Sequence, residues 1–290
     1  MAERPYRGPT VGRLLRIALG VAAVFAALWF GFELLGRPQE APQPETEEET
    51  GTPQVSTGPE SLFPGLPASE YDVTAFRWEG NYLVYDGPET ARRGIDVSAH
   101  QQEIDWAAVA ADGVEFAMLR VGYRGYTEGT TYLDERFYDN VAGCRDNGIA
   151  VGVYFFSQAI SVEEALEEAD ITLRAIEGLD ITYPVVYDWE NVHQSDARTA
   201  NLDDETLTDC AAAFCQAVED AGYTAAVYFN QAYGYGHFNL LELQDYVFWL
   251  AQYADAPDFY YDYQIWQYTN AGQVAGIEGD VDLNLSFWSP

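Results

Sequence analysis

The chain has 290 residues, with 47 acidic residues against 14 basic ones and a formal net charge of −33 at pH 7. A nucleic-acid-binding surface needs positive charge, so nucleic acid is a poor partner for this chain. The length allows one large domain or two small ones, and an aromatic content of 15% suits a groove that stacks flat rings. The three cysteines and three scattered histidines lack zinc-ligand spacing, and no glycine-rich dinucleotide fingerprint follows a strand. We therefore expect neither a metal nor another cofactor.

The first 35 residues have the pattern of a membrane segment. Residues 17–32 carry no charge and follow four arginines, which predicts a basic cytoplasmic tail over residues 1–16 and a transmembrane anchor over residues 17–35. A cleaved signal peptide is the alternative interpretation. In both cases the arginines stay inside and the C-terminal part is exported. We predict a single-pass protein of the cell membrane whose main domain lies outside the cytoplasm, or, alternatively, a secreted protein.

Two segments separate the predicted anchor from the main domain. Residues 36–70 are rich in proline and glutamate, which predicts a disordered linker because such a segment cannot bury enough apolar surface to fold. The stretch "AFRWEGNYLVYDG" (75–87) alternates on either side of Gly80 and Asn81. This pattern predicts a β-hairpin within a lead-in over residues 71–90.

The remaining residues, 91–290, alternate between short apolar runs and helical stretches. Alternation of strand and helix predicts parallel strands covered by helices, and eight strands in about 200 residues predict an irregular, TIM-like β/α barrel. The predicted strands are residues 93–98, 116–123, 150–157, 183–190, 225–230, 247–253, 263–269 and 279–284. The predicted helices are residues 134–148, 162–178 and 203–222. Ser161 has the position of an N-cap, and so does Asp105 before a further short helix.

The stretch "YPVVYDWENV" (183–192) places two carboxylates after an apolar run. Strand side chains alternate, so Asp188 and Glu190 share a face, with their Cα atoms roughly 6.5 Å apart. Two carboxylates that close cannot both ionise easily, so one pKa rises and a proton donor stands beside an anion. This arrangement suits the cleavage of a glycosidic bond. An acidic loop after a strand is the alternative interpretation.

Two further carboxylates, Asp96 and Asp282, accompany the first and the last predicted strand. Barrel enzymes carry their catalytic groups at the carboxyl ends of the strands. We therefore expect these two residues to share one site with the Asp188 and Glu190 pair.

At this point the chain resembles the glycoside hydrolase family 25 (Ch-type) lysozymes, which are N-acetylmuramidases. The resemblance follows the order of the family's motifs over nearly all of the chain after residue 92. It is carried by "RRGIDVSAHQQEIDW" (92–106), "FAMLRVGYRGYTEG" (116–129), "GVYFFSQAIS" (152–161), "PVVYDWE" (184–190), "FWLAQY" (248–253), "IWQYT" (265–269) and "GDVDLN" (279–284).

The resemblance implies a fold, a reaction and roles for the acidic residues. The fold is an irregular β/α barrel, and the reaction cleaves the β-1,4 bond from N-acetylmuramic acid to N-acetylglucosamine in peptidoglycan. By position, Glu190 is similar to the family's general acid. Asp188 is similar to the carboxylate that assists the substrate's acetamido group in a retaining, substrate-assisted route, and Asp96 and Asp282 match two further acidic groove residues. Where relatives carry His-Gln-Gly, this chain ends the turn with Gln102, so we expect that turn to differ.

Seven aromatic residues lie at or near the predicted strand ends. We interpret them as platforms that stack on sugar rings, with a place in the barrel core as the alternative for each. They are Tyr123, Tyr154, Phe156, Tyr228, Trp249, Trp266 and Tyr268. Arg120 and Arg124 are candidates for binding a substrate carboxylate, although pairing with the many acidic neighbours is the favoured interpretation.

The sequence therefore favours a membrane-tethered muramidase. We expect it to act as a monomer on peptidoglycan glycan strands and to contact the lipid bilayer through its N-terminal anchor. The alternative is a non-catalytic protein that binds wall glycans in the same groove, and the presence of Glu190 argues against it.

Overall fold

The computed structural model describes residues 58–192 and 194–288. The predicted cytoplasmic tail, the predicted anchor and residues 36–57 of the predicted linker lie outside these ranges. Within them, no helix has the length and apolar character needed to cross a bilayer.

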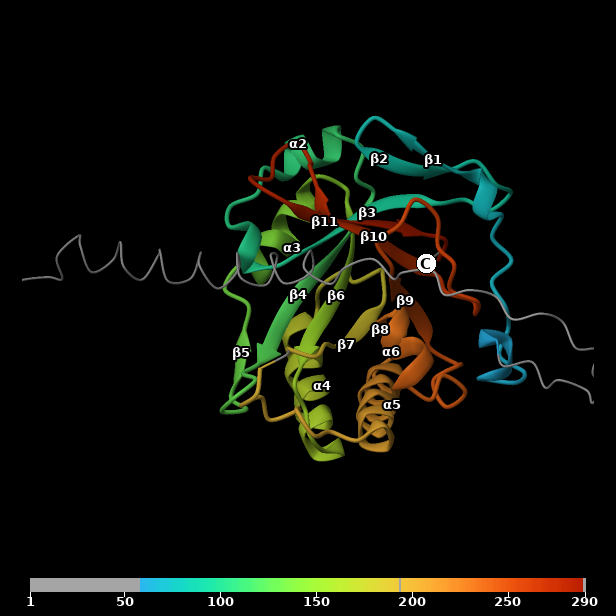
Figure 1. Cartoon of the computed structure of the whole chain (residues 1–290). Helices are drawn as coiled ribbons and strands as arrows, with labels where there is room; N and C mark the ends of the chain where they lie inside the picture. Colours follow the sequence, from blue (N-terminus) through green and yellow to red (C-terminus); the bar gives the residue numbers. More distant parts are fainter. Residues whose placement is uncertain (1–57, 193, 289–290) are drawn as a thin grey trace, which may run out of the picture. The chain divides into compact units, whose positions relative to one another are not determined.

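Eight strands close into a barrel (Figure 1), and each of them coincides with a predicted strand. Six successive neighbour pairs are parallel, from β3 through β4, β6, β7, β8 and β9 to β10. A short strand, β5 (Thr131–Leu133), extends the sheet beside β4 and has no counterpart among the predictions. The barrel strands are β3 (Arg92–Val97), β4 (Phe116–Arg124), β6 (Ala150–Ser157), β7 (Val185–Trp189), β8 (Ala225–Asn230), β9 (Val247–Ala251), β10 (Ile265–Gly272) and β11 (Val281–Ser286).

The direction of the last strand differs from the prediction. We predicted only parallel strands, but β11 runs antiparallel to both of its neighbours, β10 and β3. The chain reverses over residues 273–280 without a crossover helix, so β11 begins at the end of the barrel where the parallel strands finish. Asp282 therefore lies at that end because it is near the start of its strand, and it pairs in register with Asp96.

Helices cover one side of the barrel. The predicted helices are confirmed as α3 (Phe137–Asp146), α4 (Val162–Ile176) and α5 (Asp204–Asp220), which pack on β4, β6, β7 and β8. Ser161 caps α4 by accepting from the Glu164 amide, and Asp105 caps the short α2 (Trp106–Ala111). A further short helix, α6 (Gln231–Gly236), has no counterpart among the predicted helices, and its first turn is capped by the Asn230 side chain.

An N-terminal segment covers the side of the barrel that lacks long helices. The predicted hairpin is confirmed as β1 (Phe76–Glu79) and β2 (Tyr82–Tyr85). Residues 58–70, which we predicted as the end of the disordered linker, are instead packed: the Ser69 amide donates to the Tyr260 carbonyl at 2.8 Å, and Leu66 is buried. Their few apolar side chains pack against an aromatic face of the barrel. The composition of the whole proline-rich segment does not indicate this, because it averages these residues with the polar ones.

The core has two layers. Side chains inside the barrel, such as Phe116, Met118 and Trp249, form one layer, and the space between the barrel and its covering elements holds the other. Cys144, Cys210 and Cys215 are unpaired and lie buried under the helices, as expected of small apolar residues.

The turn that departs from the family pattern stores backbone strain. Gln102 has a φ of 57° and a ψ of −128°, a conformation that glycine adopts far more readily than a residue with a Cβ atom.

Gln102→Gly is therefore expected to stabilise the protein by about 1 kcal/mol in equilibrium denaturant unfolding. The matched control is Gln101→Gly, because the Gln101 side chain accepts from the Ser98 amide in a capping box. The control variant should lose stability, and a loss in both variants would contradict the strain.

Candidate active site

A pocket of about 270 Å³ opens at the carboxyl ends of the parallel strands. The four carboxylates that the sequence singled out line it together, although they come from three strands and one loop position. The remaining lining residues are Val97, Ser98, His100, Gln101, Arg120, Tyr154, Phe156, Tyr228, Trp249, Tyr253 and Gln267. The expectation that Asp96, Asp188, Glu190 and Asp282 share one site agrees with this geometry.

Strand β7 aims the central pair of carboxylates. Asp188 lies in register with Phe156 of β6 and Tyr228 of β8, so its side chain points into the barrel. Trp189 takes the opposite face and packs against the Tyr233 ring at 5.3 Å. Glu190 follows directly after the strand and lies at the pocket mouth, where solvent reaches it.

Asp96 is held by two amide side chains. Its Oδ2 accepts from Gln267 Nε2 at 2.9 Å and from Asn284 Nδ2 at 2.8 Å. Gln267 Oε1 in turn accepts from the hydroxyls of Tyr228 and Tyr253, at 3.0 and 3.1 Å. These amides fix one carboxyl group deep in the pocket without neutralising it.

The four carboxyl groups disturb one another's ionisation. Burial raises the pKa of Asp96 to about 6. Burial, and then the charge of Asp96, raise the pKa of Glu190 to about 7, and burial with both of these neighbours raises the pKa of Asp282 to about 8. The pKa of Asp188 lies well above its usual range through burial and the charge of Glu190, and Arg120 opposes this shift. The pocket therefore retains protons at neutral pH.

Arg120 does not cancel the negative charge of the pocket, because it is already paired. Its Nε and Nη2 atoms both lie 2.8 Å from Oδ2 of Asp134, whose side chain is fully buried. Asp134 Oδ2 also accepts from the Ala99 amide at 3.0 Å. The pair thus ties β4 to the turn that brings His100 to the pocket wall.

The predicted aromatic platforms divide into two groups. Tyr154, Phe156, Tyr228 and Trp249 line the pocket. Tyr123 does not line it; its ring stacks on Tyr132 at 5.2 Å, beside the Arg120 guanidinium.

Trp266 and Tyr268 face away from the pocket, contrary to our interpretation. The Trp266 indole donates to the Gln252 carbonyl at 2.8 Å, and the Tyr268 hydroxyl accepts from the Leu83 amide of the hairpin at 3.3 Å. Alternation along β10 turns Gln267 inward in their place. In "IWQYT" the pocket residue is therefore the glutamine between the two aromatic residues that we predicted. Asn284, the other amide at Asp96, was also not predicted, because only aromatic and charged residues were considered for the site.

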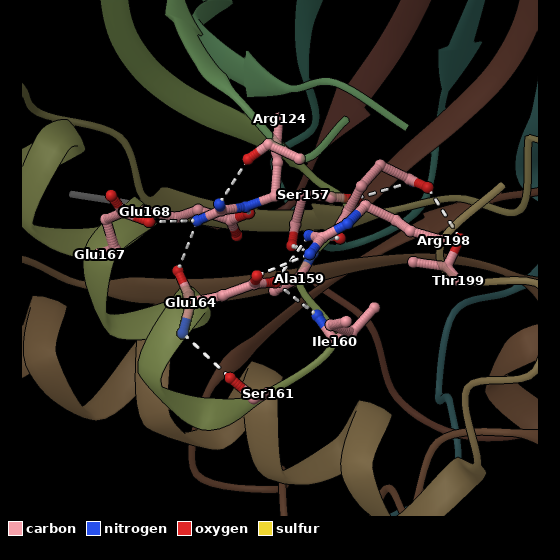
Figure 2. Close-up of polar contacts among 12 residues, drawn as sticks. Arg124, Ser157, Ala159, Ile160, Ser161, Glu164, Glu167, Glu168, Arg198 and Thr199 are labelled. Atoms are coloured by element: carbon pink, nitrogen blue, oxygen red, sulfur yellow. Dashed lines mark hydrogen bonds and ion pairs between the residues drawn. The ribbon is translucent and has the colours of Figure 1, made fainter. Parts of the chain in front are cut away.

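Behind Glu190, a buried glutamine joins two loops. Gln158 Nε2 donates to the Glu190 carbonyl at 2.8 Å, and its Oε1 accepts from the Thr199 hydroxyl at 2.9 Å. Arg198 donates to the Gln158 carbonyl and forms a two-bond pair with Glu164 at 2.6 Å (Figure 2). The backbone of Glu190 is thereby held by residues outside the pocket, independently of the pocket side chains.

Arg124 also lies beside Glu164 and does not line the pocket. Its guanidinium pairs with Glu168 at 2.6 Å and with Glu167 at 2.8 Å (Figure 2), as expected from its acidic neighbours. Glu168 is fully buried, and burial raises its pKa to about 7.

Among the residues that the structure describes, no group of three or more His, Cys, Asp or Glu side chains has an arrangement that could hold a metal ion. What the pocket offers chemically is a set of carboxyl groups that differ in pKa, surrounded by aromatic rings. Such a set can donate a proton to one atom and stabilise positive charge at another.

The raised pKa values predict that acid stabilises the fold. A carboxyl group whose pKa is higher in the folded state holds a proton that the unfolded chain releases, so stability falls as pH rises from about 4 to about 8. Asp96 alone, raised from 3.8 to about 6, accounts for about 3 kcal/mol. Carboxylates with lowered pKa, such as Glu164 beside Arg198, lose their contribution only below 4.5, outside this window.

Thermal unfolding between pH 5 and pH 8 measures this effect. The melting temperature is expected to fall with rising pH and to do so also in 1 M salt, which screens surface repulsion but not the buried pocket. Asp282→Asn is expected to flatten the dependence. A melting temperature that rises with pH, or a slope that salt abolishes, would contradict the burial of these charges.

Comparisons with known proteins agree with the geometry. Residues 95–277 match the family described as "Glycosyl hydrolases family 25". Lysozyme M1 of Streptomyces globisporus is 30% identical over 205 residues, which cover 66% of each chain, and the uncharacterised protein YegX of Escherichia coli K12 is 30% identical over 66% of this chain and 68% of its own.

Solved structures give the same result. The modular autolysin LytC of Streptococcus pneumoniae is 26% identical with a TM-score of 0.61, and its complex with a synthetic peptidoglycan ligand has a TM-score of 0.59. The similarity covers 73% of this chain but 52% of the autolysin, so this chain spans about half the length of that relative. Because the family match covers more than half of the chain and includes the end of β3 and all of the strands β4 to β10, the chain belongs to glycosyl hydrolases family 25 and is a glycoside hydrolase.

Proposed function

We propose that this glycoside hydrolase is a lysozyme that cleaves the β-1,4 bond between N-acetylmuramic acid and N-acetylglucosamine in peptidoglycan. The observation that carries the proposal is Glu190, a solvent-reachable carboxyl group with a pKa of about 7, beside Asp188 in an aromatic pocket. A group with that pKa is partly protonated at neutral pH and is therefore a competent general acid. The lysozyme relative and the autolysin's peptidoglycan ligand support the same substrate class.

In the first step, Glu190 donates its proton to the glycosidic oxygen and the bond from that oxygen to the sugar C1 breaks. The carbonyl oxygen of the same sugar's acetamido group bonds to C1 from the opposite face, which gives a positively charged oxazolinium ring. Asp188 stabilises this ring, because positive charge close to a carboxyl group favours its ionised form. Asp188 enters this step already ionised and neither gains nor loses a proton in it. The positive charge of Arg120, which lowers the pKa of Asp188, favours this carboxylate form.

In the second step, the Glu190 carboxylate accepts a proton from a water molecule whose oxygen attacks C1. The ring opens, the acetamido group is restored and Glu190 is protonated again. Two inversions at C1 give net retention, as in substrate-assisted glycosidases. Asp96 and Asp282 do not touch the reacting bond in this scheme. The charge of Asp96 raises the pKa of Glu190, and the charges of Asp96 and Glu190 raise the pKa of Asp282.

The product of wall digestion tests this assignment. Residues 58–290 are incubated with purified peptidoglycan, and released fragments are identified by mass spectrometry. Fragments ending in reducing muramic acid are expected, and Glu190→Gln should lower their rate of release by about 10²–10⁴-fold, the range for a general acid. Glu205→Gln, on the exposed first turn of α5, is the matched control and should leave the rate unchanged.

Two outcomes would overturn parts of the proposal. Fragments ending in reducing glucosamine would retain the glycosidase and reject the bond assignment. Binding to peptidoglycan without any release of fragments would favour the non-catalytic wall-glycan-binding protein, with the carboxylates as a ligand site.

Peptidoglycan lies outside the cytoplasm, and the apolar run at residues 17–35 is suited to tether the domain there as a single-pass protein. Fractionation of cells that express the full chain tests this proposal. A tethered chain remains with membranes after a high-salt wash and is digested by protease added outside, whereas a cleaved chain appears in the medium.

A further inference from the structure

The hairpin β1–β2 precedes residues 95–277, which match the family. It forms a separate two-stranded sheet that packs against the outside of the barrel. Leu83 is fully buried, and the Phe76 ring meets the outward face of Trp266 edge to face at 5.1 Å. Figure 1 shows the hairpin beside β3, on the side of the barrel away from α4 and α5.

One hairpin residue is ordered but left open to solvent. The Trp78 indole Nε1 donates to Asp255 Oδ1 at 2.8 Å, and its ring meets Tyr268 edge to face at 5.8 Å. The side chain is still 46% exposed. An indole whose polar atom is satisfied and whose orientation is already fixed offers a flat apolar face at little further cost in conformational entropy.

The position of Trp78 links it to the pocket. Asp255, its hydrogen-bond partner, follows Tyr253 by two residues, so the two Cα atoms are at most about 7 Å apart. Tyr253 lines the pocket through its hydroxyl contact with Gln267 and is itself 54% exposed. Isolated exposed aromatic residues need no explanation. Trp78 lies on β1, but its hydrogen bond to Asp255 joins it to the loop that carries Tyr253 at the pocket mouth.

We propose that Trp78 and Tyr253 form an additional glycan-binding subsite, which extends the catalytic pocket along the substrate strand. The inference rests on the proposed function for its ligand, a polymer of pyranose rings. The apolar face of a pyranose stacks on the exposed face of an indole. A short substrate fills the pocket alone, and a long strand also reaches Trp78.

Hydrolysis rates on substrates of two lengths test the subsite. The kcat/KM of residues 58–290 is measured on a muramic acid–glucosamine tetrasaccharide and on glycan strands of more than ten disaccharides. Trp78→Ala is expected to lower the ratio of long-strand to tetrasaccharide kcat/KM about tenfold, through KM, which is the size of one strong aromatic stacking contact. Trp78→Phe retains a flat ring and should restore most of the ratio.

Two controls separate stacking from folding. Trp78→Leu keeps apolar contact with Tyr268 but lacks a flat face, so it should behave as Trp78→Ala does while the thermal unfolding temperature stays near that of the wild type. Tyr138→Ala removes a ring on α3 that is outside the pocket and somewhat more exposed than Trp78, and it should leave the ratio unchanged.

The subsite would be rejected if Trp78→Ala and Trp78→Leu left the ratio unchanged, or if both substrates lost activity equally. Failure of the wild-type protein to cleave either substrate would instead reject the proposed function, so the two failures are distinguishable.

Discussion

The constraint on which the rest of the structure depends is the placement of four carboxyl groups in one pocket at the end of a closed barrel. Burial and mutual repulsion keep these groups from ionising together, so protons remain in the pocket at neutral pH. The same arrangement that makes Glu190 a proton donor also costs folding free energy as pH rises. Chemistry and acid stability are two consequences of one electrostatic arrangement.

The barrel tolerates this concentration of charge because the surrounding groups are rigid. Asp96 lies under two amides that belong to β10 and β11, and Gln158 fixes the backbone of Glu190 through bonds to two loops. The antiparallel direction of β11 contributes to the arrangement, because it brings Asp282 into register with Asp96 at the pocket end of the barrel. The arginines nearby, Arg120 and Arg124, are occupied by their own carboxylates and leave the pocket acidic.

Much of the fold could be predicted from sequence because strand and helix signals are local. Short apolar runs located all eight barrel strands, and capping residues such as Ser161 located helix starts. Strand direction could not be predicted, since a short apolar run reads the same in either direction. The acidic residues were found because carboxylates at buried strand ends are unusual, whereas Gln267 was missed because one position along a strand decides which face a side chain takes. The packing of residues 58–70 depends on an aromatic surface assembled from distant segments, which no local pattern reveals.

The most direct test of the account is the pH dependence of kcat/KM on peptidoglycan strands, measured at constant ionic strength with the wild type and Asp96→Asn. If Glu190 is the acid and Asp96 raises its pKa, activity falls above an apparent pKa of about 7, and removing the Asp96 charge moves this limb to lower pH. A limb that stays in place in Asp96→Asn, or activity that persists undiminished to pH 9, would contradict the central claim that interacting carboxyl groups of the pocket hold the catalytic proton.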